Sequence, residues 1–256
     1  MKRFKSEFVH SYATYSFGYC EYAVLDKNDR LGNVYAEGFL PYTGAPDIKK
    51  TLYMARSARI DLKKFSLNSE NRRILKRFDG KLTRHVIPFA KFPKDEPHFR
   101  TFCLKYFAKR HGEHVMPAKR LDTILEAGFI THITTYTDKN DTVIGYVFLC
   151  NDDTMNQYWF SFYDLAYAYQ SLGLWIMLDC ARHAHKNNLS YFYVGTVYDE
   201  KALYKTNFEG LEFWNGEQWI DDIQLLRKLA RNDHERVHDG LDRWKETHDT
   251  FVEKGA

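Results

Sequence analysis

The feature that most constrains the fold is a succession of strand-like and helix-like segments between residues 129 and 197. Three consecutive segments are rich in β-branched and aromatic residues, and the polar turn Asp138–Asp141 between the first two predicts a hairpin. An apolar segment of helical length follows, and then another strand-like segment. The order predicts an antiparallel meander followed by a strand, helix and strand unit, with these bounds: Phe129–Thr137, Thr142–Cys150, Asn156–Tyr163, Ser171–Lys186 and Ser190–Val197.

The rest of the 256 residues divides into regions with different patterns. Residues 1–92 indicate a small α+β domain, with strands at Asn33–Leu40 and Leu52–Leu62 and a basic helix at Ser69–Phe78. Prolines at 88, 93 and 97 indicate a linker, and Phe99–Arg110 then has a helical period. We therefore predict a basic N-terminal domain (1–92), a second domain (93–220) and an acidic helical tail (221–256) with a break at Arg231–Asp233.

Charge is distributed unevenly along the chain. Residues 1–120 hold 25 Lys and Arg against 12 Asp and Glu, a net of +13, whereas the whole chain has a net of only +3. Such asymmetry favours contact of the basic half with nucleic acid or a membrane, and a solvated basic surface is the alternative. The basic helix concentrates four cations of the kind that contact phosphates: Arg72, Arg73, Lys76 and Arg77.

Several classes of protein are disfavoured by what the sequence lacks. The longest suspicious apolar stretch, Leu165–Leu178, is shorter than the roughly 20 residues of a membrane span, and the N-terminus has no apolar core of a signal peptide. Cys20, Cys103, Cys150 and Cys180 lie far apart without a CxxC pair. We therefore expect a cytoplasmic protein with free thiols, no membrane contact, no metal and no cofactor.

Polar residues at the ends of the predicted strands are candidates for a site. Asp164 follows the third strand, where it could hold an ammonium group, and Gly173 opens the apolar helix, where a ligand could approach the backbone closely. Lys201 and Lys205 share a face if their segment is an α-helix. The alternatives are a solvated loop aspartate, a packing glycine and an exposed lysine pair. Residues 169–175 contain one glycine and lack the pattern that binds the pyrophosphate of acetyl-CoA.

An ordered set of short motifs over residues 99–220 resembles the C-terminal domain of arginyl-tRNA–protein transferases and their bacterial leucyl/arginyl relatives. Its pieces are Tyr106 with Arg110-His111, Phe160-Ser161-Phe162-Tyr163-Asp164, Ser171-Leu172-Gly173, Tyr191-Phe192-Tyr193-Val194-Gly195, Tyr204-Lys205-Thr206-Asn207-Phe208 and a turn at 216–219. The first half resembles that family's N-terminal domain at Glu37-Gly38-Phe39, at Ala58-Arg59-Ile60-Asp61-Leu62 and at 69–77. Where the family has a cysteine cluster this chain has residues 42–55 without cysteine, and only Cys20 stands near the family's first one.

The resemblance implies an α+β chain with an N-acyltransferase (GNAT-like) fold behind a smaller basic α+β domain. It implies transfer of an amino acid, of arginine or leucine type, from charged tRNA to the N-terminal amine of a protein or peptide, with aminoacyl-tRNA as co-substrate. The implied catalytic residues are Asp164, Tyr163 and His111, and the implied tRNA-binding residues are Arg59, Arg72, Arg73, Lys76 and Arg77. The implied substrate-binding residues are Tyr106, Arg110, Ser171, Gly173, Tyr193, Lys201, Tyr204 and Lys205.

Two other functions remain open from the sequence. One is an acyl-CoA-dependent N-acyltransferase that acts on a small molecule. The other is a relative without catalytic activity that binds RNA or protein.

Overall fold

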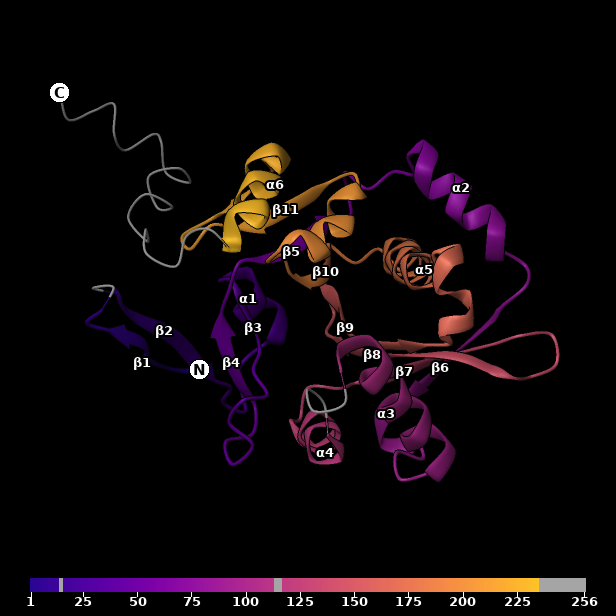
Figure 1. The fold of residues 1–256 in the computed structure, drawn as a ribbon, viewed down its shortest axis with the longest axis horizontal. Helices are drawn as coiled ribbons and strands as arrows, with labels where there is room; N and C mark the ends of the chain where they lie inside the picture. Colours follow the sequence, from indigo (N-terminus) through magenta and orange to yellow (C-terminus); the bar gives the residue numbers. More distant parts are fainter. Residues whose placement is uncertain (14–15, 113–116, 235–256) are drawn as a thin grey trace.

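A computed structural model describes residues 1–13, 16–112 and 117–234, which form two β-sheets and the helices packed on them (Figure 1). The smaller sheet has the strand order β1-β2-β4-β3, and the larger one has the order β12-β11-β5-β10-β9-β8-β7-β6. The mixed α/β architecture and the large sheet agree with the predicted fold class.

The small sheet is antiparallel throughout and comes from the first part of the chain. Its strands are β1 (Lys2–Ser11), β2 (Ser16–Val24), β3 (Phe39–Pro41) and β4 (Thr51–Met54), and the short helix α1 (Leu31–Ala36) precedes β3. The predicted strand at 33–40 is wrong in its first half. Val34 and Tyr35 are neighbours that are both buried in the same core cluster, which a helical turn allows and the alternation of a strand does not.

The large sheet contains the predicted hairpin and the strand, helix and strand unit. The meander β7 (His132–Thr137), β8 (Val143–Asn151) and β9 (Met155–Tyr163) is antiparallel, and β10 (Tyr191–Thr196) then pairs with β9 in parallel. The other strands are β5 (Ser57–Asp61), β6 (Thr83–Pro88), β11 (Leu211–Trp214) and β12 (Trp219–Ile220). The crossover from β9 to β10 is α5 (Leu172–Lys186), which begins and ends within a residue of the predicted bounds.

Helices cover both faces of the large sheet. Helix α2 (Ser69–Phe78) packs with α5 over one face, and their apolar side chains share one core cluster with the strands. Helices α3 (Pro97–His111) and α4 (Ala118–Glu126) build a second cluster against Phe148 and Phe162 on the opposite face (Figure 1). The remaining helices are η1 (Phe89–Lys91), η2 (Leu165–Gln170), η3 (Glu200–Asn207), α6 (Ile223–Arg231) and η4 (Asn232–His234).

The predicted boundary at residue 92 does not separate two bodies. Strands β5 and β6 and helix α2 precede it, yet both strands hydrogen-bond within the large sheet and α2 packs on α5. The sequence pattern does not predict strand β6, because Pro88 indicates a linker. A proline can nevertheless end an edge strand, because no ladder hydrogen bond is needed from its nitrogen there. In the predicted tail, α6 ends at Arg231 as expected, and residues 235–256 lie outside the described residues.

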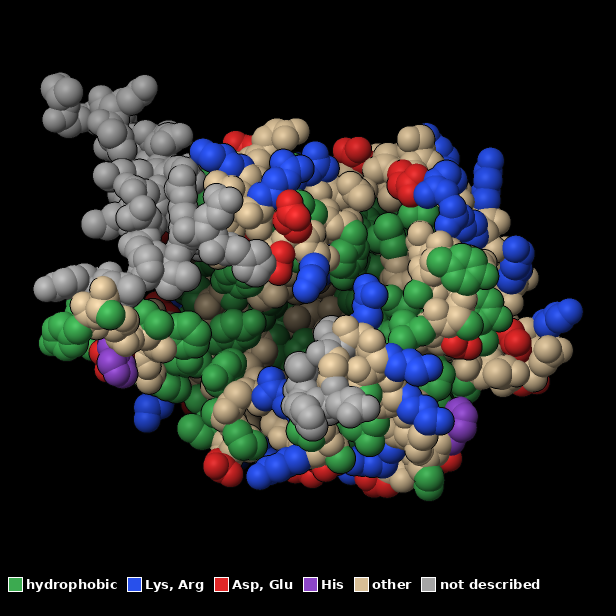
Figure 2. All heavy atoms as spheres, in the orientation of Figure 1, with side chains coloured by type: hydrophobic (Ala, Val, Ile, Leu, Met, Phe, Trp, Pro, Cys, Tyr) green, Lys and Arg blue, Asp and Glu red, His purple; other side chains and the backbone are tan. Residues whose placement is uncertain are grey.

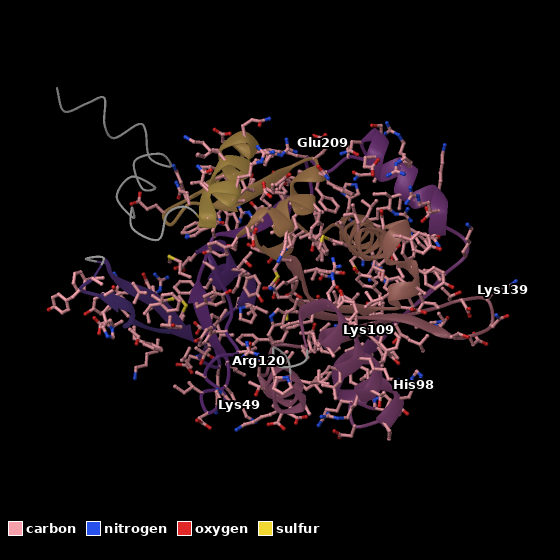
Figure 3. The ribbon with its side chains drawn as sticks, viewed as in Figure 1. Lys49, His98, Lys109, Arg120, Lys139 and Glu209 are labelled. Atoms are coloured by element: carbon pink, nitrogen blue, oxygen red, sulfur yellow. The ribbon has the colours of Figure 1, made fainter. Side chains whose placement is uncertain are left out.

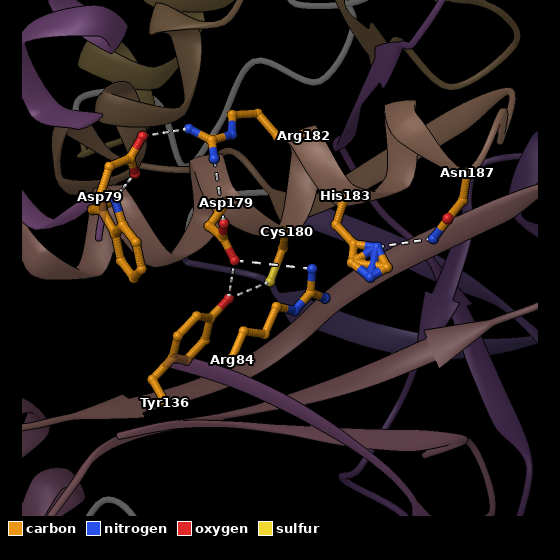
Figure 4. A network of polar contacts seen from close by, with 9 residues as sticks. Asp79, Arg84, Tyr136, Asp179, Cys180, Arg182, His183 and Asn187 are labelled. Carbon is orange, nitrogen blue, oxygen red and sulfur yellow. Dashed lines mark hydrogen bonds and ion pairs between the residues drawn. The ribbon is translucent and has the colours of Figure 1, made fainter. Parts of the chain in front are cut away.

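A partly buried polar network joins the large sheet to α5 and α2 (Figure 4). The Tyr136 hydroxyl donates to the Asp179 carboxylate at 2.8 Å, and the Arg84 guanidinium lies 3.9 Å from the same carboxylate. At the C-terminal end of α2, the Asp79 carboxylate accepts from the Trp175 indole and from the Arg182 guanidinium, both on α5. These contacts hold α5 in place over the sheet, because buried polar groups are stable only when they are paired. Over the described residues, none of the helices is both long and apolar enough to cross a membrane.

Candidate functional site

The candidate site lies where β9 and β10 separate. Their parallel pairing covers only three pairs, from Tyr191 opposite Met155 to Tyr193 opposite Gln157. Strand β9 continues to Tyr163 without β10 as a partner, while β10 stays paired with β5 along its length, with a register shift between Tyr193 and Gly195. The divergence leaves backbone groups at the end of β10 outside the β9 ladder, where side chains or a substrate can reach them.

A β-bulge decides which side chains of β9 face this opening. The pairing with β8 shifts between Phe148 and Leu149, so that Trp159 is passed over. The shift puts Tyr158 on the same face as Ser161 and Tyr163, which a strict alternation along β9 would not do. Tyr158 is buried, and its pKa lies well above the usual range because of burial, while a hydrogen bond with Ser161 acts in the other direction.

Tyrosines from three elements meet at this opening, and a glycine from a fourth lies against them. The ring of Tyr163 lies 5.0 Å from the ring of Tyr106 on α3, and it also lies against Gly173 on α5. Burial raises the pKa of Tyr106, and the nearby Tyr163 adds to the effect. Tyr204 on η3 is 43% exposed, and desolvation by the surrounding residues raises its pKa to about 12. The predicted residues Tyr106, Tyr163, Gly173 and Tyr204 therefore come from distant parts of the sequence into one tyrosine cluster, which Tyr158 joins.

Lys205 brings a positive charge to the tyrosine cluster. Its Nζ donates to the Thr196 carbonyl at the end of β10, at 2.7 Å, and lies 5.9 Å from the centre of the Tyr204 ring. Burial lowers the pKa of Lys205 to about 8, and no carboxylate of the described chain offsets that effect. Two of its three N–H donors are left for a substrate once the bond to Thr196 is made.

Arg110 adds a second positive charge to the same cluster. It is exposed near the end of α3, and its guanidinium acts on both Tyr106 and Tyr204 in the direction that lowers their pKa. Burial outweighs that effect at both hydroxyls. The cluster thus presents neutral hydroxyl donors together with two cations, a combination that suits an oxygen atom on which negative charge develops.

One protein side chain, the ring of Tyr163, lies against the first turn of α5. A Cβ built on Gly173 would lie 2.7 Å from Cε1, Cζ and Oη of Tyr163, so the glycine makes room for that ring. Ser171 precedes the helix in the left-handed conformation, with φ 66°, and its side chain makes no capping bond. The helix η2 leads directly into this turn, and its last carbonyl, that of Gln170, accepts from Arg77 at 2.8 Å.

The structure shows fewer contacts for Asp164 and His111 than for the tyrosine cluster. The Asp164 carboxylate caps η2 by accepting from the Ala166 N–H at 2.9 Å, and it is half-buried beside Tyr163. His111 is the last residue of α3, and its side chain lies outside the described residues. The catalytic roles of both residues stay predictions.

Three predicted positions differ from the expectation. Lys201 and Lys205 do not share a helix face, because η3 is a 3₁₀ helix in which residues three apart eclipse, and Lys201 points into solvent. Tyr193 is fully buried and packs against Tyr35 at 5.0 Å, on the side of β10 away from the cluster. It therefore cannot contact a substrate at the opening.

Arg59 is not a surface residue for tRNA. It is only 7% exposed, its guanidinium lies 3.0 Å from the Glu212 carboxylate, and it lies over the rings of Tyr191 and Trp219 at 3.8 and 4.0 Å. A cation held between a carboxylate and two aromatic faces has no free donor surface for phosphate. The sequence did not indicate that Arg59 lies on β5, an inner strand of the large sheet.

The predicted basic helix is α2, and its cations lie on the surface. Arg72 and Lys76 are exposed, and Arg73 is exposed but bonded to Glu70 at 2.5 and 2.7 Å. Arg77 is half-buried and donates to η2. The helix therefore presents a basic outer face, although three of its four cations already have protein partners, since Arg72 also donates to the Leu67 carbonyl.

The described residues contain no group of three or more His, Cys, Asp or Glu side chains placed to hold a metal ion. Cys103, Cys150 and Cys180 are buried, and burial raises the pKa of all three thiols. Buried thiols of raised pKa are poor nucleophiles, which leaves the tyrosine cluster with its two cations as the candidate site.

Residues 70–206 match the acetyltransferase (GNAT) domain family, and the match covers more than half of the chain. The chain belongs to the GNAT family. The match begins within α2 and ends within η3, so it includes the divergence of β9 from β10 and the tyrosine cluster. A search of curated protein sequences found no match. The acyltransferase fold predicted from the sequence is confirmed, whereas membership of the arginyl-tRNA–protein transferases remains a prediction.

Solved structures with a similar fold are distant in sequence. The C-terminal domain of a putative lysylphosphatidylglycerol synthetase from Agrobacterium fabrum is 14% identical with a TM-score of 0.42, over 56% of this chain and 46% of that one. L-PGS from Bacillus licheniformis is 13% identical with a TM-score of 0.39, over the same shares of the two chains. FemX is 9% identical with a TM-score of 0.41, over 65% and 59%. The chain thus spans less than half the length of the first two.

Proposed function

We propose that this GNAT chain transfers an amino acid, of arginine or leucine type, from charged tRNA to the N-terminal amine of a protein or peptide. The observation that carries the proposal is the filled first turn of α5. An acyl-CoA enzyme of this fold needs open backbone N–H groups and glycines there for the pyrophosphate. Here the ring of Tyr163 occupies the space beside Gly173, and the pattern of glycines is missing.

The basic half of the chain supports a nucleic acid as the carrier of the acyl group. Residues 1–120 have a net charge of +13, and α2 presents Arg72 and Lys76 to solvent within the same structural unit as the cluster. A-form RNA is bound mostly through its backbone and its shape, for which spaced cations suffice. Charged tRNA thus fits both the filled pyrophosphate position and the surplus of positive charge.

The cluster supplies what transfer from an ester requires. The N-terminal amine attacks the ester carbonyl, a C–N bond forms, and the bond to the tRNA ribose oxygen breaks. The carbonyl oxygen carries negative charge in between, and Lys205 with a tyrosine hydroxyl can donate to it. The attacking amine loses a proton, and the leaving ribose oxygen gains one. Since the ester is already activated, positioning supplies much of the rate.

Asp164 is proposed to hold the ammonium group of the transferred residue. It stands at the end of β9 beside Tyr163, it is half-buried, and one of its oxygens caps η2. A carboxylate in that position can form a charge-assisted bond to a cationic amine. The capping bond fixes the carboxylate in place without using all of its acceptor capacity.

The test is a filter-binding measurement with charged and uncharged tRNA, followed by a transfer assay with a labelled amino acid and a peptide acceptor. The proposal expects binding of charged tRNA and appearance of label in the peptide. Binding of tRNA without transfer would mean that the chain is an RNA-binding protein without aminoacyl transferase activity. An enzyme that ignores tRNA and acylates an amine from acyl-CoA would contradict the proposal directly.

A further inference from the structure

The short helix η3 carries two residues of the candidate site, Tyr204 and Lys205. It is a 3₁₀ helix of eight residues, and such helices are uncommon beyond about four residues because the geometry of their hydrogen bonds is poor. Lys205 donates to the Thr196 carbonyl only while η3 lies against the end of β10. Contacts from outside η3 must therefore fix the place of Lys205.

Asp233 on η4 contacts the loop that leads from β10 into η3. Both oxygens of its carboxylate accept from Nη2 of Arg56, at 2.6 and 2.8 Å, and one of them also accepts from the Asp199 N–H at 2.8 Å. The side chains of Arg56 and Asp233 are only 10% and 11% exposed. An ion pair so shielded is screened little by salt, so it ties the loop firmly to the residue that precedes β5.

The backbone of Asp199 needs a contact of this kind. Asp199 has φ 64° and ψ 156°, a conformation that glycine adopts readily and in which a residue with a side chain is strained. Strained backbone persists only where the surrounding structure holds it. The Asp199 N–H is the group that Asp233 binds, and the Asp199 carbonyl accepts from the Ala202 N–H at 3.0 Å in the first turn of η3. Asp233 thus holds the strained residue from which η3 begins.

Arg56 holds the residues before Asp199 as well. Its backbone N–H donates to the Tyr198 hydroxyl at 2.8 Å, and its guanidinium lies 4.5 Å from the centre of the Tyr198 ring. Its carbonyl accepts from the Val197 N–H at 3.0 Å. Arg56 and Asp233 together therefore contact three successive residues of the loop between β10 and η3.

The other end of η3 is held by α6. Nε of Arg227 on this helix donates to Oγ1 of Thr206 at 3.0 Å. Helix α6 is itself fixed to the core, because Leu226, Leu229 and Ala230 are buried, and Figure 2 shows Lys and Arg side chains over this part of the surface. Since η4 follows α6 directly, one continuous segment holds both ends of η3.

We propose that Asp233 is a positioning residue for the candidate site. Through Arg56 and the Asp199 N–H it keeps the loop before η3 in its strained conformation, and Lys205 therefore stays against the end of β10. That Lys205 then acts on an acyl group rests on the proposed function. The placing of Lys205 by Asp233 does not rest on it, because the contacts that carry it lie within the chain.

The experiment labels the lysines of the full chain with acetic anhydride over a range of pH and reads each lysine by mass spectrometry. Burial lowers the pKa of Lys205 to about 8, so the midpoint pH of its labelling reports whether it is in place. Asp233→Ala removes both contacts, and we expect the midpoint to rise from about 8 toward the ordinary value of 10.5. The transfer rate should fall by about 10²-fold, the cost of displacing a group at a reaction centre by about 1 Å.

The rescue is Asp199→Gly in the Asp233→Ala chain. Glycine adopts the native conformation of residue 199 without strain, so the loop needs less help from Asp233 and the midpoint should return toward about 8. The matched control is Glu209→Gln, which removes an exposed carboxylate just after η3 (Figure 3). It should leave the midpoint and the transfer rate unchanged.

A folded Asp233→Ala chain in which Lys205 keeps the native midpoint would overturn the proposal, and so would a glycine that restores nothing. If Asp233→Ala does not fold, as judged by circular dichroism, Asp233→Asn keeps the shape, removes the charge and decides by the same midpoint. A raised midpoint in either variant, with no amino acid transfer by the native chain, would retain the positioning role and reject the proposed function alone.

Discussion

The large and small sheets are both built from aromatic strands, yet they place their rings in opposite environments. In the large sheet Tyr136, Phe148 and Phe162 are fully buried between helices on both faces. In the small sheet only one face is covered, and the hairpin of β1 and β2 exposes Tyr12 by 80%. The chain's 18 Tyr and 19 Phe therefore serve in two environments: a ring builds the core where helices cover the strand and stays exposed where they do not.

A similar difference separates the buried cation of the site from the exposed cations elsewhere in the chain. The ammonium group of Lys205 is buried where it donates to the Thr196 carbonyl, so its positive charge acts in a poorly solvated place. The cations of α2 and β1 lie on the surface, where they act additively and are screened by salt. The predictions below test whether the two regions behave as differently as their burial suggests.

The largest effect is expected at Lys205. Lys205→Met should lower the transfer rate by about 10²- to 10³-fold, the range for loss of one oxyanion donor. Single-turnover kinetics with a peptide acceptor measure it. Lys139→Met, at an exposed lysine in the turn between β7 and β8 (Figure 3), is the control and should transfer at the native rate. An equal rate for the two variants would remove Lys205 from the chemistry.

The pKa of Lys205 also predicts a pH dependence. Since the ammonium form donates, the transfer rate should fall as pH rises through about 8. Lys205→Arg should retain part of the activity and lose this alkaline decline, because arginine stays charged. The folded chain loses the proton before the unfolded chain does, so the free energy of unfolding should rise between pH 8 and about 10.5. A rate that rises in this window would show that the neutral amine is the active form.

A large effect on stability, without one on RNA binding, is expected at Arg59. Arg59→Met leaves Glu212 half-paired in a buried place and should lower the free energy of unfolding by about 3 kcal/mol. The loss is at the lower end for a buried pair, because Lys64 still lies 3.6 Å from Glu212. Urea denaturation measures it. The exposed pair of Arg73 and Glu70 is the control, and Arg73→Met should change the free energy of unfolding little, because solvent screens an exposed ion pair. Similar losses at both sites would contradict the burial of Arg59.

A moderate effect is expected at Asp164. Asp164→Asn keeps an oxygen that can cap η2 and removes the charge that would hold an ammonium group. Transfer should fall by at least about tenfold, which corresponds to about 1.4 kcal/mol, while the melting temperature changes little. Kinetics and thermal unfolding of one preparation give both values. Lower stability with a native rate per folded molecule would make Asp164 a capping residue alone.

The smallest effect is expected on the basic outer face of α2. Replacing Arg72 and Lys76 by glutamine should weaken tRNA binding and reduce the slope of log affinity against log salt by about 0.7–0.9 for each phosphate that the variant no longer binds. The control pair Lys139→Gln and Lys186→Gln removes two exposed lysines outside α2. If both pairs give the same slope, α2 does not contact the RNA.

The sequence predicted the centre of the fold well, because the apolar patterns of β7 to β10 and of α5 are set by local periodicity. It predicted Tyr106, Tyr163, Gly173, Tyr204 and Lys205, which the structure brings together. Tyr158 was missed because a bulge in β9 shifts its face, and a bulge follows from pairing with β8 and not from the segment itself.

Arg59 and Tyr193 were misplaced for a related reason. Both lie on strands whose neighbours in the sheet come from distant parts of the chain, with β5 inserted between β10 and β11. The pattern of a single strand does not say which of its faces will be covered. The insertion of β5 is also why the boundary at residue 92 could not be predicted from the prolines around it.

The central claim is that the acyl group arrives as an ester on tRNA and not as a thioester on coenzyme A. The most direct measurement offers both donors together, with differently labelled amino acid on tRNA and acetyl group on coenzyme A, and one peptide acceptor. The account predicts that the peptide acquires the amino acid label alone, because the ring of Tyr163 fills the first turn of α5. Peptide that carries the acetyl label, at a rate unaffected by the tRNA, would contradict it.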